Sequence, residues 1–556
     1  MAPPARLVRW LAASLAITPS LALTPVHIAL QHARSLQAAG EPITAYAAQR
    51  PAYNLSVPID HFHNDSLYEP HSDGFFDLRY WVDESHYRPG GPVIVLAAGE
   101  IDADERLPYL DHGIVAMLAR ATGGVGVVLE HRYYGTSFPF QNVTVDSLRF
   151  LSTDQALADT AYFAKHVKFP RHGGLNAPDT PYIIYGGSYA GAFAAFARKL
   201  YPDVFWGAIS SSGVTAAVFD YWEYFEAARL FAPGECGPKH QNIFKIVDNV
   251  LLGGDRDKVR ALKNVFGLGD LEEDKDFAET LSTPIYGLQS TNWDPKLDDY
   301  EWGHYCGAIT SGALLYGSTR HLLPTVKKLV AEAGFDDDDE IVYNLLNFIG
   351  FSKGTIVRTL KGPCKGLSAQ KCFSREEQLN DIAQHGLIPT WVISWFYQTC
   401  TQWGYFVTGT GVPQDQLPLV SRVIDLAYAH AHCPILFNIT PKASIVDSVN
   451  RLGGFDFSYP RVAIVDGSRD PWRQATPHRL GLPERNSSVE EPFILLDYGV
   501  HHWDENGLPG ESGEPDLPPF EVLETQREEV DFVKAWLQEF EVERRQRQVD
   551  DGPSDL

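Results

Sequence analysis

The chain has 556 residues, of which 44% are hydrophobic and 21% are charged. This composition is typical of a globular protein with a large core and excludes an intrinsically disordered chain. Acidic residues outnumber basic ones by 71 to 46, for a formal charge of -25 at pH 7. Such a surface repels phosphate groups, so we expect no nucleic-acid partner. Because self-repulsion falls when carboxylates are neutralised, we also hypothesise an acidic working pH.

The N-terminus has the pattern of a secretory signal peptide. Arg6 and Arg9 precede an apolar stretch from Trp10 to Ile17, and Ser20-Leu21-Ala22 places small residues at a cleavage site. We therefore predict a signal peptide over residues 1–22. The apolar run is too short to cross a bilayer, and no later segment has an uncharged run of spanning length, so we expect no membrane span.

Two further features of the sequence agree with export. Acceptor sequences for N-glycosylation, Asn-x-Ser/Thr, occur at Asn54, Asn64, Asn142, Asn438 and Asn486. The six cysteines are an even number, which permits three disulfides, and none lies in a Cys-x-x-Cys or zinc-type pattern.

Strand and helix patterns alternate in the first part of the mature chain. Residues 23–50 show no clear pattern, and a pro-segment there is left open. We expect five strands, at Phe76–Val82, Pro92–Ala97, Val125–Leu129, Tyr182–Tyr185 and Trp206–Ser210. Helical patterns lie between them at Leu107–Thr122, Thr153–Val167 and Ala190–Leu200. This alternation predicts a parallel sheet with helices on both faces.

The alternation stops between about Val218 and Cys433, where the chain is mostly helical in character. This segment contains the six cysteines Cys236, Cys306, Cys364, Cys372, Cys400 and Cys433. Strand patterns return at Arg461–Val465 and Pro492–Leu496, and an amphipathic helix follows over Val522–Phe540. We therefore predict a sheet domain in two parts, residues 23–217 and 434–545, an inserted helical domain with disulfides, residues 218–433, and an acidic tail, residues 546–556.

One segment carries the strongest chemical signal. In Tyr182–Ala195 a buried strand runs into a tight turn bearing Ser188, and an alanine-rich helix leaves it. This is the layout of a nucleophile elbow, whose sharp turn requires small residues two before and two after the serine. Gly186 and Ala190 stand there, although the usual second residue is glycine. The turn points the Tyr189 amide, at a helix N-terminus, to where an oxyanion would form. An ordinary glycine-rich turn is the alternative.

A serine hydroxyl needs a base to act as a nucleophile, and in folds with such an elbow the acid and the histidine follow in that order. Asp466 and Asp470 lie at and after the end of the first C-terminal strand, and His501 and His502 lie after the second. Sites are built in loops at the carboxyl ends of such strands. Spacing alone does not choose within either pair. Turn capping by the aspartates and packing or hydration of the histidines remain alternatives.

Several segments together resemble the lysosomal Pro-X carboxypeptidase and dipeptidyl peptidase II family of serine peptidases, which includes fungal acid prolyl endoproteases. The matches run in one order through nearly the whole mature chain. They are Ile59–Phe62 (IDHF), Glu130–Gly135 (EHRYYG), Asp154–Asp159 (DQALAD), Gly186–Gly191 (GGSYAG), Trp395–Cys400 (WFYQTC), Asp470–Trp472 (DPW) and Val500–His502 (VHH).

The resemblance implies an α/β-hydrolase fold with a large helical cap domain inserted between nucleophile and acid. It implies the catalytic triad Ser188, Asp470 and His501, with the Tyr189 amide in the oxyanion hole. It also suggests a disulfide between Cys400 and Cys433. The resemblance does not pair the other four cysteines, for which Cys364–Cys372 and Cys236–Cys306 are guesses. Members of the family often have Gly-Asn-Glu-Gly where this chain has Ala98-Gly99-Glu100-Ile101. The second oxyanion donor and the contact with a substrate terminus therefore stay open.

We predict a serine peptidase that cleaves proline-containing peptides or proteins on the carboxyl side of proline through an acyl-enzyme, as a carboxypeptidase or a dipeptidyl peptidase. No metal or organic cofactor is needed for this chemistry. The alternatives are a prolyl endoprotease of the same family, a carboxylesterase or lipase with the same triad, and an inactive binding module.

A proline ring requires a compact apolar pocket. Candidate walls are Trp472, Trp503, Trp395 and Tyr397, because they flank the triad or belong to the matched cap segment. Core packing is the alternative role for each of them. We expect a secreted protein or one of an acidic vacuolar or lysosomal lumen. The oligomeric state is left open, with a homodimer as one option.

Overall fold

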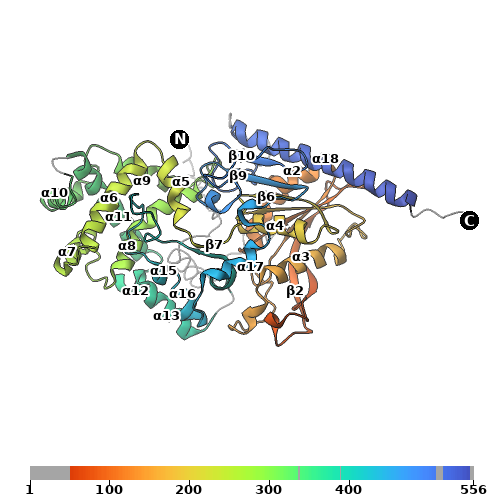
Figure 1. Cartoon of the computed structure of the whole chain (residues 1–556), viewed down its shortest axis with the longest axis horizontal. Coiled ribbons are helices and arrows are strands. Elements are labelled where there is room, and N and C mark those ends of the chain that lie inside the picture. Colours follow the sequence, from red (N-terminus) through yellow and green to blue (C-terminus); the bar gives the residue numbers. More distant parts are fainter. Residues whose placement is uncertain (1–49, 336–338, 388–389, 509–516, 551–556) are drawn as a thin grey trace, which may run out of the picture.

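The computed structural model describes residues 50–335, 339–387, 390–508 and 517–550. The predicted signal peptide, nearly all of residues 23–50 and the end of the predicted tail lie outside the described residues. Sheet and helical parts lie side by side, with the sheet on the right in Figure 1 and most helices on the left.

An eight-stranded sheet forms the centre of one half of the molecule. Its spatial order is β1-β2-β4-β3-β5-β6-β9-β10. The strands are β1 (Tyr53–Pro58), β2 (Phe75–Asp83), β3 (Val93–Ala97), β4 (Val125–Leu129), β5 (Tyr182–Gly187), β6 (Phe205–Ser211), β9 (Val462–Gly467) and β10 (Phe493–Leu496). β1 and β2 pair antiparallel, β2 is antiparallel to β4, and all pairs from β4 to β10 are parallel. The carboxyl ends of β5, β9 and β10 therefore meet at one edge.

Two layers of helices cover the sheet. On one face lie α2 (Ile114–Thr122) and α18 (Phe520–Asp550), and on the other lie α3 (Thr153–His166) and α4 (Tyr189–Leu200). Side chains of a strand alternate between the faces, so Ile94 and Leu96 join the core under α2 and α18, while Val93 and Val95 join the other core. Burial on both faces explains why the central strands are continuous apolar runs.

Three elements differ from the sequence prediction. The helix expected over Leu107–Thr122 is broken, because Pro108 lies in the 3-10 helix η3 (Ala103–Leu110) and α2 starts only after Gly113. The edge strand β1 was not predicted. The last helix runs to Asp550 and so enters the segment predicted as a tail, where Arg547 forms an ion pair with Glu543 one turn earlier.

The chain between β6 and β9 is mostly helical. Its α-helices are α5 (Glu226–Phe231), α6 (Cys236–Leu251), α7 (Arg256–Phe266), α8 (Asp274–Ser282), α9 (Tyr300–Ile309), α10 (Leu323–Glu332), α11 (Asp339–Lys361), α12 (Ala369–Phe373), α13 (Arg375–His385), α14 (Trp391–Gln398), α15 (Leu426–Ala429), α16 (His432–Phe437) and α17 (Asp447–Asn450). Two short parallel strands, β7 (Val218–Asp220) and β8 (Gly404–Phe406), pair within it. The limits of a separate inserted domain, residues 218–433, stay a prediction.

Three disulfides cross-link this helical part. They are Cys236–Cys306, Cys364–Cys372 and Cys400–Cys433, which are the pairs suggested from the sequence. All six cysteines belong to the large apolar cluster that also includes one face of the sheet. The helical part therefore packs on the sheet through a continuous core.

Candidate active site

Ser188 occupies a strained turn between β5 and α4. Its φ of 62° and ψ of -127° are unusual for a residue with a side chain. A Cβ at Gly186 would lie 1.9 Å from the carbonyl oxygen of Ala190, so only glycine fits two residues before the serine. The Ser188 amide donates to the carbonyl of Ser211 at 2.9 Å, which ties the turn to β6. The predicted elbow is therefore present in the backbone.

Asp470 and His501 meet at the carboxyl ends of β9 and β10. The Oδ2 atom of Asp470 accepts a hydrogen bond from His501 Nδ1 at 2.8 Å, and its Oδ1 accepts one from the Trp472 amide at 2.8 Å. Both side chains are buried. With Nδ1 used as the donor, the Nε2 atom of His501 is the ring nitrogen that can accept a proton.

The histidine loop lies against the elbow. A Cβ at Gly187 would lie 3.2 Å from the ring of His502, the neighbour of His501. Ser188 Oγ and His501 Nε2 are both buried, and neither has a hydrogen-bond partner among the described residues. The structure thus joins the acid to the histidine but shows no hydrogen bond between Ser188 and His501. Catalytic hydrogen bonds are often long before substrate binds.

The rival residues have other partners. Asp466 Oδ2 lies 2.7 Å from Nδ1 of His478, and His502 Nδ1 lies 2.9 Å from Oε2 of Glu505. Spacing left the pairing of acid and histidine open. In the structure Asp470 pairs with His501, whereas Asp466 and His502 have other partners.

The electrostatics of the pair suit a base that is neutral at rest. Burial holds the pKa of His501 below its usual value, although the Asp470 carboxylate acts in the opposite direction. For Asp470, burial opposes ionisation, but His501 and the Trp472 amide together hold its pKa below the usual range. A charged acid beside a neutral imidazole is the resting state that proton abstraction requires.

Ser212 positions this pair and was missed by sequence reasoning. Its hydroxyl accepts a hydrogen bond from the His502 amide at 2.9 Å and helps to lower the pKa of the Asp470 carboxyl. Its φ of 45° marks a tight turn after β6. A serine in a run of serines has no distinctive pattern, so no local signal could have identified it.

Tyr189 is the first residue of α4, so its N–H is one of the first-turn donors that have no partner within the helix. Its hydroxyl lies 2.9 Å from His131 Nε2 and accepts a hydrogen bond from Gln398 Nε2 at 3.0 Å. Gln398, at the end of α14, in turn accepts a hydrogen bond from Tyr134. Residues of three matched segments thereby hold the first turn of α4 in place.

The loop after β3 approaches the same turn. Gly99 has a φ of 77°, and a Cβ there would lie 3.0 Å from the Cβ of Ala190. Glu100 is only 2% exposed, its Oε1 has no hydrogen-bond partner among the described residues, and burial raises its pKa to about 7. This carboxyl is therefore largely protonated in acid.

An aromatic cavity of about 70 Å³ adjoins the site. Trp472 follows Asp470 closely in the chain, and Trp395 packs edge-on against the Tyr189 ring with the ring centroids 5.6 Å apart. Both line this cavity, with Tyr405, Phe406, Thr399 and His432 among the other walls. Trp503 and Tyr397 are not among its lining residues. The indole of Trp503 donates to the Thr291 carbonyl, and Tyr397 packs against Phe437.

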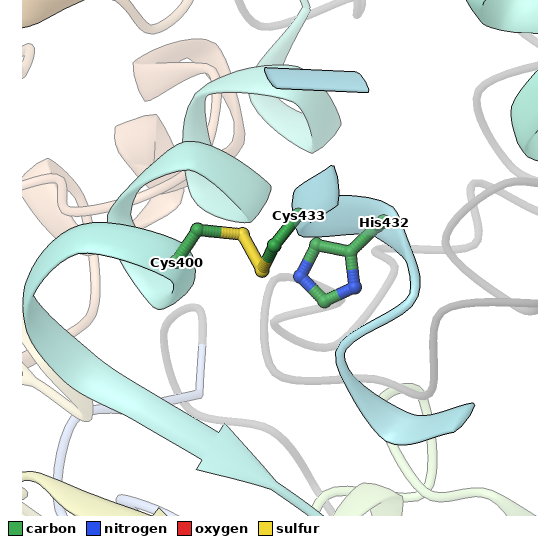
Figure 2. Close-up of side chains that lie close together, drawn as sticks. All are labelled: Cys400, His432 and Cys433. Carbon is green, nitrogen blue, oxygen red and sulfur yellow. A yellow bond between two sulfur atoms is a disulfide. The ribbon is translucent and has the colours of Figure 1, made fainter. Parts of the chain in front are cut away.

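His432 lies beside two cysteines, but these are oxidised. Figure 2 shows Cys400 and Cys433 joined by their sulfur atoms, with the His432 ring next to them. No thiolate remains there to bind a metal, and of these three residues only His432 lines the cavity. Elsewhere, the five predicted glycosylation residues, Asn54, Asn64, Asn142, Asn438 and Asn486, are all exposed.

The parallel sheet, the elbow and the buried pair of Asp470 and His501 have the layout of a serine hydrolase with the α/β-hydrolase fold. Residues 58–308 match the family model described as Serine carboxypeptidase S28. A "Probable extracellular serine carboxypeptidase" of Arthroderma benhamiae is 47% identical over 491 residues, which cover 88% of this chain and 68% of that protein. The chain belongs to the S28 family of serine carboxypeptidases.

More distant relatives extend the likeness. "Serine protease vicPa" of Bipolaris victoriae is 30% identical over 77% of this chain and 80% of its own length. "Prolyl carboxy peptidase like protein 5" of Caenorhabditis elegans is 25% identical over 87% of this chain and 89% of its own length. Within the described residues, none of the helices has the length and apolar character needed to cross a membrane.

Proposed function

We propose that this protein is a secreted serine carboxypeptidase that cleaves on the carboxyl side of proline through an acyl-enzyme at Ser188. The hydrogen bond between Asp470 and His501, in a loop packed on the nucleophile elbow, carries this proposal. A peptidase that cuts internal bonds after proline uses the same chemistry, so the cut position is decided by experiment.

The proposed reaction has two halves. Ser188 Oγ attacks the carbonyl carbon of the proline residue, and the proton of the hydroxyl passes to His501 Nε2. The carbon–nitrogen bond breaks as His501 returns the proton to the leaving amine, which leaves an ester on Ser188. Water then attacks this ester while His501 Nε2 takes its proton. The bond between the acyl carbon and Ser188 Oγ breaks, His501 returns the proton to Oγ, and the acid product leaves. Asp470 orients the imidazole and stabilises its charged form.

Backbone amides would stabilise the oxyanion in both halves. The Tyr189 amide is one proposed donor, and the backbone at Gly99 and Glu100 is positioned near Ala190 to supply a second. A neutral Glu100 favours this arrangement, because a carboxylate there would oppose the developing negative charge.

The preference for proline is supported by the cavity. Its flat apolar walls, Trp395 and Trp472, suit a compact ring that cannot donate a hydrogen bond. A relative is named a prolyl carboxypeptidase-like protein, which agrees with this choice. Secretion is supported by the predicted signal peptide, the three disulfides and a relative named as extracellular.

The test is digestion of one N-terminally blocked peptide that contains an internal proline and a penultimate proline, read by mass spectrometry. We expect release of the C-terminal residue only, and no release when the C-terminus is amidated. Internal cuts would assign an endoprotease instead. Release of an N-terminal dipeptide from a matching peptide with a free N-terminus would indicate a dipeptidyl peptidase. Hydrolysis of an acyl ester without cleavage of the peptides would indicate an esterase. Ser188→Ala is the control, and it should also lose labelling by a fluorophosphonate.

A further inference from the structure

A second histidine–carboxylate cluster lies far from the proposed triad in the sheet order. The loop between β1 and β2 brings together Asp60, His63 and His71. Each offers one ligand atom, and these atoms all lie within 4.8 Å of one another. β1 and β10, after which His501 lies, are the two outermost strands of the sheet, so the cluster and the triad lie at opposite ends of the strand order. The loop follows β1 near the red end of the chain in Figure 1.

The Asp60 carboxylate is fixed before any ion arrives. Its Oδ1 accepts hydrogen bonds from the Phe62 amide at 2.9 Å and from Gln155 Nε2 at 2.7 Å. Its Oδ2 lies 2.7 Å from His71 Nδ1. Outer donors that orient a ligating carboxylate are typical of metal sites.

The two histidines lie on the solvent side of this carboxylate. Their ring centroids are 5.4 Å apart, and the side chains of His63 and His71 are 49% and 25% exposed. Asp73, which is fully exposed, lies 3.9 Å from His63 Nδ1. An ion can therefore enter from solvent, with Asp73 or water in a fourth position.

We propose that Asp60, His63 and His71 form a binding site for a divalent first-row transition metal, with Zn²⁺ as the probe. Two imidazoles and a carboxylate suit Zn²⁺, Ni²⁺ or Cu²⁺, whereas Ca²⁺ and Mg²⁺ prefer oxygen ligands alone. On binding, the ion replaces the proton between His71 Nδ1 and Asp60 Oδ2, and that proton leaves to solvent. The ion would join the two ends of the loop and stabilise the folded protein without taking part in peptide hydrolysis.

The test uses the full-length protein, treated with a chelator and titrated with Zn²⁺ by calorimetry and by competition with a chromophoric chelator. We expect one Zn²⁺ per chain and a rise in the unfolding temperature. His63→Ala and His71→Ala should each weaken binding at least about tenfold, since even outer-sphere changes cost roughly that much. Ca²⁺ should neither bind nor stabilise.

His172→Ala is the matched control. His172 Nδ1 lies 3.0 Å from Glu84 Oε1, so it resembles the His71–Asp60 pair, but no third ligand joins it in the part of the chain that the structure describes. This variant should bind Zn²⁺ as the unmodified protein does. His63 is half exposed, so His63→Ala should fold, which its unfolding temperature without metal verifies. Absence of stoichiometric binding, or equal binding by the His63→Ala/His71→Ala double variant, would overturn the proposal whatever the peptidase activity.

Discussion

The sheet half and the helical half of this molecule are stabilised by different means. The sheet half contains no cysteine and rests on an eight-stranded ladder buried under helices on both faces. Among its described residues the helical half has only two strands, each of three residues, and it contains all three disulfides. An exported protein can use cross-links where a ladder of hydrogen bonds is missing.

In the proposed function, the same division separates the residues of the reaction from those that select the substrate. Ser188, Asp470 and His501 lie at the ends of strands, where a rigid scaffold holds reacting groups in register. Most walls of the aromatic cavity, including Trp395 and Tyr405, come from the helical half. The difference indicates that the two halves can be altered separately, and the following changes test it from the largest expected effect to the smallest.

Replacing Ser188 by alanine should lower kcat on the order of 10⁶-fold, because the acyl-enzyme can no longer form. Binding of a product peptide to the cavity, measured by calorimetry, should stay nearly unchanged.

Asp470→Asn and Asp466→Asn form a matched pair at the end of β9. The first should cost about 10⁴-fold in kcat and the second far less. Equal losses with unchanged unfolding temperatures would refute the assignment of the acid.

Removing a disulfide should destabilise the helical half more when the disulfide closes a longer loop, with a logarithmic dependence on loop length. Cys236 and Cys306 are 70 residues apart, whereas Cys364 and Cys372 are 8 apart. Loop-closure entropy predicts a loss of about 4 kcal/mol for the first pair and about 2.5 kcal/mol for the second. Urea unfolding of the double Cys→Ser variants measures both. If the short loop proves the more important, native-state packing decides instead.

Changing a cavity wall should affect substrate choice more than chemistry. Trp395→Ala should reduce kcat/KM for a proline peptide on the order of 10–100-fold, because an apolar wall is lost, and should spare hydrolysis of a small acetyl ester. Tyr397→Ala is the control, since it alters an aromatic residue of the same helix that does not line the cavity. A parallel fall in ester hydrolysis for Trp395→Ala would show that the two halves are not separable.

The smallest effect concerns pH and lies within the sheet half. Glu529 of α18 is fully buried against Asp504 of the histidine loop, and burial raises the pKa of both carboxyls. The folded protein therefore holds a proton that the unfolded chain releases near pH 4, so the free energy of unfolding should fall as pH rises above that value, by at most about 1.4 kcal/mol per pH unit.

Glu529→Gln should flatten this slope, and Glu524→Gln, which alters an exposed residue of the same helix, should not. Urea unfolding between pH 4 and pH 7 provides the measurement. If the free energy of unfolding of Glu529→Gln depends on pH as strongly as that of the unmodified protein, other groups cause this pH dependence.

Local pattern was enough to predict much of this protein. Seven of the eight strands of the main sheet were expected close to their observed bounds, because each is an apolar or alternating run between turns. The elbow could be read from Gly186 and Ala190, since the turn leaves no room for a larger residue. Of the disulfide pairs, only Cys400–Cys433 came from a resemblance to a family, and the other two were guesses that the structure confirms.

Only the tertiary structure decided what depends on contacts between distant segments. It pairs Asp470 with His501 and gives Asp466 and His502 other partners, a choice that spacing left open and that only the resemblance to a family had implied. It also places the Ser212 hydroxyl against the His502 amide, and it brings Asp60, His63 and His71 together in the loop between β1 and β2. Sequence periodicity reports which face of an element is buried, whereas a polar partner is set by how loops from different strands pack, and periodicity carries no record of that.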